Sequence, residues 1–132
     1  MRDKGGYYTR PCVRHNADGT TETVDVQCIR LARLYDFQWG NVVKYLWRWR
    51  GKNGLEDLQK AWDYAKSADC DPTPTRDLMG VRDTIYGLIE AGDMPQVETD
   101  AWLSILNQSR RGVVIALTSM IKHQKQLKQN TE

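Results

Sequence analysis

The segment GNVVKYLWRWRGKNGLEDLQKAWDYA (residues 40–65) decides the fold of this chain. It carries three Trp and five Lys or Arg residues within about seven helical turns. In its first half, apolar side chains recur at helical spacing, which predicts a helix from about Gln38 to Arg50 with one face in a core. That apolar stripe consists of Trp39, Val42, Val43, Leu46 and Trp49.

The second half of the segment predicts another helix, from Asn53 to about Ala68. The Asn53 side chain can cap its first turn while Glu56 reaches back in a capping box. Only Gly51 to Asn53 separate the two helices, so we expect them to fold as an antiparallel hairpin. The apolar stripe of this helix consists of Leu55, Leu58, Trp62 and Ala65.

Each helix also carries a polar stripe, and the hairpin would bring the two stripes together. Lys and Arg suit phosphate oxygens, and Tyr rings can stack on a base. An aspartate could hold Mg²⁺. The pattern therefore predicts a nucleotide-sized anion site, made of Asn41, Lys44, Tyr45, Arg48, Lys52, Asp57, Lys60 and Tyr64. The alternative is that Lys44 and Arg48 are surface charges paired with Asp57 or Asp63 across the hairpin.

The remaining sequence completes a prediction of one mainly α domain over residues 1–132. Residues 6–26 predict a β-hairpin, with a turn at Asn16–Gly19 and β-branched residues after it. Residues 27–68 form a helical core and 74–128 add further helices. The expected helices outside the segment span about residues 25–35, with Val26, Ile29 and Leu34 inward, then 74–90 with Pro74 in its first turn, 97–107 and 110–128.

Composition and charge narrow the class of protein. The three cysteines are odd in number and widely spaced, which indicates neither a disulfide framework nor a zinc site and favours a reducing cytoplasm. No apolar run approaches the roughly 18 residues of a membrane span. The net charge is +2, yet residues 30–52 hold six Lys or Arg against one Asp, and residues 69–109 carry −6. This asymmetry indicates an anionic ligand or self-association into a homo-oligomer.

Residues 40–64 also resemble the signature of a family of small phage proteins, GNxxKYxxRxxxK followed by EDLxKAxxY. The family is described as a domain of unknown function or as phage nucleotide kinase-like, and the resemblance covers about residues 25–66. Members of the family often have a His-Tyr pair near their start, where this chain has Tyr7-Tyr8. The matching positions are Gly40, Asn41, Lys44, Tyr45, Arg48, Lys52, Glu56, Asp57, Leu58, Lys60, Ala61 and Tyr64.

The resemblance implies a phage accessory protein in the cytoplasm of an infected bacterium, and phosphorylation of nucleoside monophosphates. The chain lacks GxxxxGK[ST], so a kinase would rely on Lys and Arg clamps with Mg²⁺ held by Asp57 or Glu56. Two other functions stay open. The protein could sequester a host nucleotide signal without turnover. It could instead block a host defence complex through its acidic block, Asp69 to Asp100.

Overall fold

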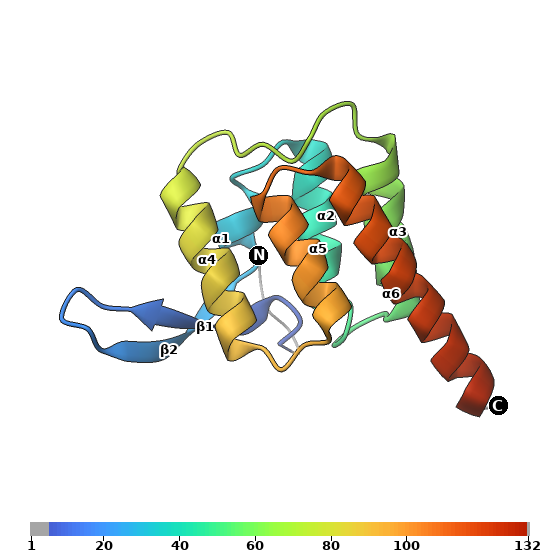
Figure 1. The fold of residues 1–132 in the computed structure, drawn as a ribbon, viewed down its shortest axis with the longest axis horizontal. Helices are drawn as coiled ribbons and strands as arrows, with labels where there is room; N and C mark the ends of the chain where they lie inside the picture. Colours follow the sequence, from blue (N-terminus) through green and yellow to red (C-terminus); the bar gives the residue numbers. More distant parts are fainter. Residues whose placement is uncertain (1–5, 132) are drawn as a thin grey trace.

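A two-stranded hairpin followed by six helices makes up the part of the chain that the computed structural model describes, residues 6–131 (Figure 1). This confirms the prediction of a mainly α fold with a short N-terminal β-hairpin. The elements are β1 (Thr9–His15), β2 (Thr21–Gln27), α1 (Ile29–Ala32), α2 (Phe37–Arg48), α3 (Leu55–Ser67), α4 (Leu78–Ala91), α5 (Gln96–Leu106) and α6 (Arg110–Thr131).

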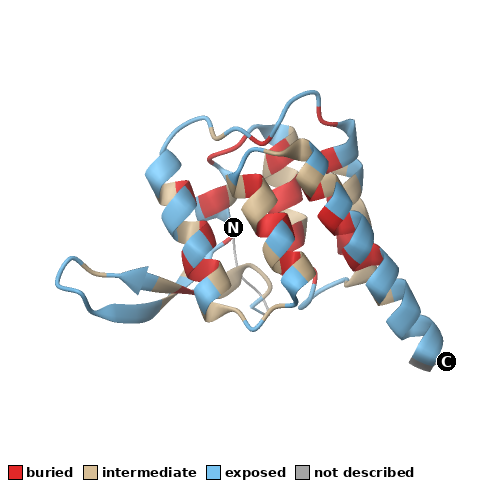
Figure 2. Cartoon of the chain, in the orientation of Figure 1, coloured by how far each residue is buried: buried red, intermediate tan, exposed pale blue. Residues whose placement is uncertain are grey.

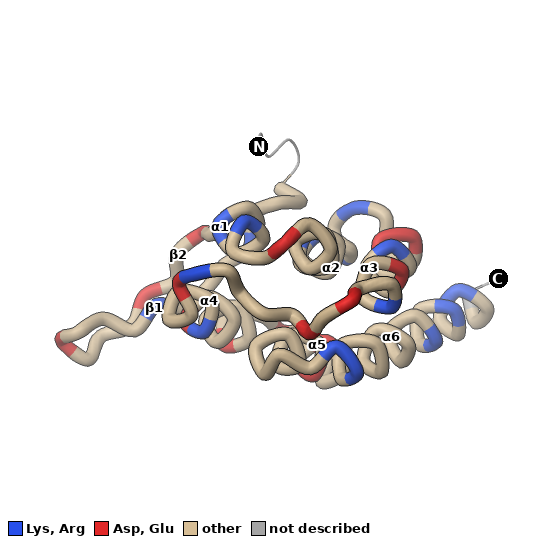
Figure 3. Tube along the Cα trace, turned by 90° about the horizontal axis from the view of Figure 1, so that it is seen from above, with Lys and Arg blue, Asp and Glu red and all other residues tan. Residues whose placement is uncertain are grey.

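The helices form two layers. Seen from above, α1, α2 and α3 lie in one row and α4, α5 and α6 in the other (Figure 3). The core fills the space between the rows, and the predicted apolar stripe of α2 is buried in full. The tip of the hairpin and the C-terminal end of α6 extend beyond this core and are exposed (Figure 2). No described helix is long and apolar enough to cross a membrane.

The hairpin is fixed to the second layer at its base. β1 and β2 pair antiparallel, from Thr9 opposite Gln27 to His15 opposite Thr21. Gly87 of α4 lets β1 approach closely, because a Cβ at this position would lie 2.5 Å from the carbonyl oxygen of Val13. The base of the hairpin therefore packs against α4, and its tip projects away from the helices (Figure 1).

The prediction of a helix from residue 25 is wrong in its first part. Residues 25–27 complete β2, and α1 begins only at Ile29 and lasts four residues. Val26 is half-buried on the strand, and Ile29 is exposed rather than inward, whereas Leu34 is buried as expected. Val24 and Val26 alternate with exposed neighbours, which is the two-residue period of a strand.

Two predicted helix starts are also wrong. α3 begins at Leu55 after Gly54, and no side chain caps it. The backbone N–H of Asn53 instead donates to the Asp57 carboxylate at 3.4 Å. α4 begins at Leu78 rather than at Pro74, because the Asp77 carboxylate accepts the N–H of Gly80 at 3.0 Å and so caps the first turn.

The five tryptophans are part of the framework. Four are buried, and each of the five indole N–H groups donates a hydrogen bond. Trp39 reaches the carbonyl oxygen of Cys70, Trp47 that of Tyr8, and Trp62 the hydroxyl of Thr118. These bonds tie the first layer to the linker after α3, to the N-terminal segment and to α6.

The remaining two indoles meet at a buried carboxylate, Glu98 of α5. Its Oε1 accepts from Trp49 at 3.2 Å and from Arg50 at 2.9 Å, and its Oε2 accepts from Arg10 and Trp102, each at 3.1 Å. Glu98 is fully buried, and four donors on two oxygens satisfy it. It therefore joins β1, the end of α2 and α5. No motif or spacing in the sequence pointed to this glutamate.

Candidate functional site

A buried ion pair lies at the centre of the predicted site. Arg48 donates from Nε and Nη2 to the two oxygens of Asp57, at 3.2 and 3.1 Å, and from Nη1 to the Tyr8 hydroxyl at 2.7 Å. Only 6% of the Arg48 side chain and none of Asp57 is exposed. Burial opposes the charge on Arg48, but the hydrogen bonds and charge of Asp57 outweigh it, and the pKa of Arg48 is raised. The pairing with Asp57 that the alternative interpretation predicted is thus present for Arg48, but the pair is buried, whereas that interpretation placed Arg48 on the surface.

Tyr45 lies between this ion pair and the surface, with cations around its ring. The ring centroid is 4.8 Å from Cζ of Arg48, 4.9 Å from Nζ of Lys44 and 5.5 Å from Nζ of Lys60. Its other neighbour is Tyr64, with the two rings stacked at 6.1 Å and 14°. Cations within about 6 Å of a ring are attracted by its π face. Four predicted site residues thus meet around one tyrosine.

Three aromatic residues that the sequence analysis left out of the site extend this arrangement. The Phe37 ring lies edge-on to Tyr64 at 6.0 Å, and 74% of the Phe37 side chain is exposed. At the opposite end, Nζ of Lys52 lies 5.9 Å from the rings of both Tyr7 and Tyr8. Two adjacent tyrosines near the start of the chain, Tyr7 and Tyr8, were the sequence signal that could have identified this end of the site.

We call the whole set of side chains the α2–α3 face. Its rings run in the order Phe37, Tyr64, Tyr45, Tyr8 and Tyr7, and its cations are Lys44, Arg48, Lys52 and Lys60.

Asn41 takes a separate position at the edge of the face. Its amide donates to the Phe37 carbonyl oxygen of its own helix at 2.8 Å. Together with Arg33, Phe37 and Lys44 it lines a shallow pocket of about 240 Å³ between α1 and α2. The pocket opens beside Lys44, so a flat group held there would lie next to the cations that surround Tyr45.

The cations of the face differ in how far carboxylates neutralise them. Arg48 is neutralised by Asp57, and Lys60 lies 3.3 Å from Glu56. Among the described residues, no carboxylate lies within 4.0 Å of the ammonium groups of Lys44 or Lys52. These two lysines keep their charge available for an anion.

The carboxylates of the face are less suited to hold a metal. Both oxygens of Asp57 accept from Arg48, so binding Mg²⁺ there would require breaking a buried ion pair. Glu56 is exposed and already pairs with Lys60. Over residues 6–131, no group of three or more His, Cys, Asp or Glu side chains is placed to share a metal ion.

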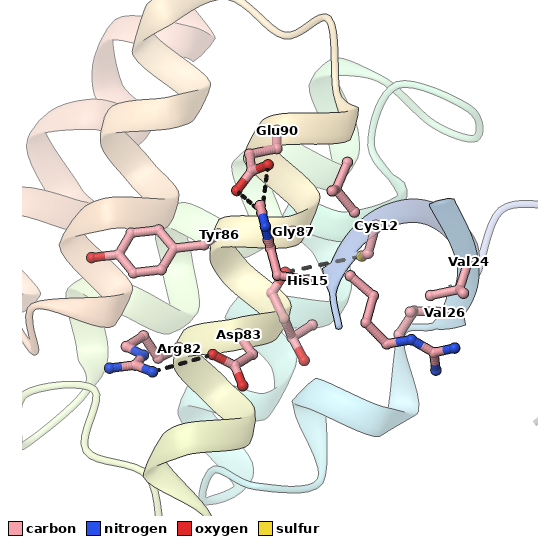
Figure 4. A pocket seen from close by; sticks show the side chains of 12 residues that line it. Cys12, His15, Val24, Val26, Arg82, Asp83, Tyr86, Gly87 and Glu90 are labelled. Atoms are coloured by element: carbon pink, nitrogen blue, oxygen red, sulfur yellow. Dashed lines mark hydrogen bonds and ion pairs between the residues drawn. The ribbon is translucent and has the colours of Figure 1, made fainter. Parts of the chain in front are cut away.

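A second concave region lies between the hairpin and α4, and its lining side chains are drawn in Figure 4. It encloses about 370 Å³ between the Val24 and Val26 side chains and the exposed side of α4. Its ionisable groups already have partners: His15 lies 3.0 Å from Glu90, Arg82 lies 3.5 Å from Asp83, and Arg14 pairs with Glu22. Since these charges are already paired, this pocket is less suited than the α2–α3 face to capture an anion.

The comparisons with known proteins match only the first half of the chain. A family model described as "Protein of unknown function (DUF3310)" matches residues 12–66. This range begins within β1 and ends within α3, so it contains both helices of the face but neither Tyr7 nor Tyr8. Comparison with curated proteins and with solved structures finds no match to this chain. A DUF3310 domain of unknown function is therefore found at residues 12–66.

Proposed function

We propose that the α2–α3 face binds a nucleotide or a nucleotide-derived anion. Lys44, Lys52 and Lys60 would contact phosphate oxygens, and the Tyr45–Tyr64 pair would supply a ring face for the base. The observation that carries this proposal is the clustering of three cations within 6 Å of the Tyr45 ring, where Lys44 has no described carboxylate within 4.0 Å. Phosphate and a π-face are the two features of a nucleotide that such a cluster complements.

The site residues then fall into two groups, one that supports the fold and one that would contact the ligand. Arg48 and Asp57 form the framework, because each neutralises the other inside the fold. Their pairing leaves the Arg48 guanidinium against both the Tyr45 and Tyr8 rings, at 4.8 and 5.7 Å, and so fixes those rings in place. The ligand contacts would come from the half-buried and exposed members: Asn41, Lys44, Tyr45, Lys52, Lys60 and Tyr64.

Binding without turnover is the form of the proposal that the carboxylates favour. Phosphoryl transfer is mainly positioning and charge stabilisation, normally with a metal ion held by carboxylates. Asp57 is ion-paired with Arg48, so the exposed carboxylate of the face that could hold a metal ion is Glu56. A phage protein that captures a host nucleotide signal would need no catalytic carboxylate. Phosphorylation of nucleoside monophosphates is therefore the second candidate, with Glu56 as the group to test.

Calorimetric titration with nucleoside mono-, di- and triphosphates tests the proposal. Wild-type protein should bind at least one of them, and Lys44→Ala should weaken that affinity at least tenfold with an unchanged melting temperature. Lys122→Ala, an exposed lysine of α6 outside the face, is the matched control and should bind like wild type. The proposal fails if wild type binds no nucleotide, or if Lys44→Ala and Lys122→Ala bind equally well.

Turnover is measured in the same samples by following conversion of a monophosphate to its diphosphate with ATP and Mg²⁺. Conversion that Glu56→Gln abolishes would establish the kinase. Tight binding without conversion would support capture alone.

A further inference from the structure

The aromatic row of the α2–α3 face is longer than one nucleotide. From Phe37 to Arg48, α2 advances about 17 Å at 1.5 Å per residue. The rings begin at Phe37 and continue past Arg48 to Tyr8 and Tyr7. The row holds five rings, so it offers stacking positions for about five bases of a single strand. A mononucleotide on Tyr45 would leave both ends of the row unused.

Cations lie beside the rings from Tyr45 onward along this row. Phe37 and Tyr64 are followed by Tyr45 with its surrounding lysines, then by Arg48 between Tyr45 and Tyr8. Lys52 follows, 5.9 Å from the next two rings. Surfaces that bind single-stranded nucleic acid combine cations that track the backbone with rings on which bases stack. Phe37, the chain's only phenylalanine, is exposed and takes no part in the core, which fits this pattern.

A basic groove continues the row at the Lys52 end. It lies between the α2–α3 loop and the projecting part of α6 and encloses about 870 Å³. Arg50, Lys52 and Lys128 line it, and Glu56 is the one acidic residue among the described residues that do so. Arg50 also bonds to Glu98, with about half of its side chain exposed. Figure 3 shows the basic residues at this loop and along the end of α6. A nucleic-acid strand that extended past Tyr7 would enter this positively charged groove.

From this continuity we infer that the α2–α3 face binds a single strand of DNA or RNA about five nucleotides long. The inference rests on the proposed function, because it places the nucleotide of that proposal within a polymer. Bases would stack on the row of rings, and phosphates would lie against Lys44, Lys60, Lys52 and the groove. A duplex is excluded as the preferred ligand because its base faces are already stacked on one another and cannot reach the rings.

Fluorescence anisotropy with a labelled ten-nucleotide thymidine strand tests the inference, with unlabelled competitors of one, two, five and ten nucleotides. Affinity should rise steeply up to about five nucleotides, because the row has five rings, and less steeply beyond, where the groove offers cations without rings. A ten-base-pair duplex should compete at least tenfold more weakly. The slope of log affinity against log salt should be about −2 or steeper, because Lys44, Lys52 and Lys60 would neutralise three phosphates of a single strand and the groove would add to them. Uridine strands of the same lengths compare RNA with DNA.

Phe37→Ala separates the polymer from the single nucleotide. Because stacking on one ring contributes about fivefold in affinity or more, the variant should weaken the five-nucleotide strand by at least that factor. Its affinity for a mononucleotide should fall by a smaller factor, because a mononucleotide on Tyr45 meets Phe37 only through Tyr64, whereas a strand would stack a base on the Phe37 ring itself. Leu78→Ala, another exposed apolar residue at the start of a helix but in the second layer, is the matched control and should change neither.

The outcomes distinguish the inference from the proposed function. If a mononucleotide binds and five nucleotides bind no more tightly, the inference is wrong and the proposed function stands. Equal competition by the duplex, or an unchanged affinity in Phe37→Ala, also overturns the inference. If neither mononucleotides nor strands bind, both are wrong.

Discussion

Replacing Arg48 by alanine should destabilise the protein strongly, although the sequence pattern placed this residue at a ligand surface. The substitution removes both hydrogen bonds to Asp57 and the one to the Tyr8 hydroxyl. Asp57 is fully buried, so its charge would lose its partner without gaining water. Lys44, four residues earlier on the same stripe, makes no comparable ion pair among the described residues. The two neighbours should therefore respond in opposite ways to the same change.

The size of the effect follows from the burial of the pair. Removing one partner of a buried ion pair costs about 3–5 kcal/mol of unfolding free energy. A chain of 132 residues unfolds with an entropy of about 0.28 kcal/mol/K, at about 2.1 cal/mol/K per residue. A loss of about 4 kcal/mol should then lower the melting temperature by about 14 °C.

Thermal denaturation followed by circular dichroism measures this effect on wild type, Arg48→Ala, Lys44→Ala, Asp57→Ala and the double variant of Arg48 and Asp57. The double variant should be far less destabilised than the sum of its two single variants, because it leaves no unpaired charge. Lys44→Ala should melt within about 2 °C of wild type, as surface substitutions usually do. A melting temperature for Arg48→Ala as high as that for Lys44→Ala would refute the assignment of Arg48 to the framework.

Three further predictions concern other parts of the fold. Glu98→Gln should lower the free energy of unfolding by about 3–5 kcal/mol, as chemical denaturation would measure. Two of the four donors would then face an amide N–H₂ group, and both arginines would lose their counter-charge. Gly87→Ala should cost about 1–3 kcal/mol, since the new Cβ would displace the backbone of β1, and an unaltered denaturation midpoint would contradict this. Burial raises the pKa of Cys12 to about 11 and that of Cys28 to about 12, so only Cys70 should react with a thiol reagent at pH 8 in the folded state. All three thiols should react after unfolding, and stability should fall as the pH rises above the ordinary thiol pKa of 9.0, because only the unfolded thiols then ionise.

The helical part of the fold could be predicted because its signal is local. The apolar stripe of α2 repeats at the period of a helix, and every member of it is buried. The end of β2 was mispredicted as helix because Val24 and Val26 follow a strand period over too few residues to exclude a helix. The pairing that decides between the two periods comes from β1. The cap of α4 was missed because Pro74 is a common first residue of helices, whereas Asp77 supplies the side chain that closes the turn.

The candidate site could be predicted only in part, because tertiary contacts decide which of its side chains are paired inside the fold and which remain open to a ligand. Spacing placed Lys44, Tyr45 and Arg48 on one stripe, but it could not tell which cation Asp57 would neutralise. Tyr8 lies 40 residues from Arg48 in the chain and reaches it only in the folded protein. Glu98 shows the same limit, because its four donors come from β1, α5 and the region that ends α2. Sequence periodicity carries no information about such distant partners.

The most direct test of nucleotide binding by the α2–α3 face is a titration of ¹⁵N-labelled protein with a mononucleotide, followed by amide chemical shifts. The account predicts that the largest shifts fall on Lys44, Tyr45, Lys60 and Tyr64 and saturate together, with amides around His15 and Glu90 unmoved. Shifts confined to the pocket between the hairpin and α4, or no shifts at millimolar nucleotide, would contradict it.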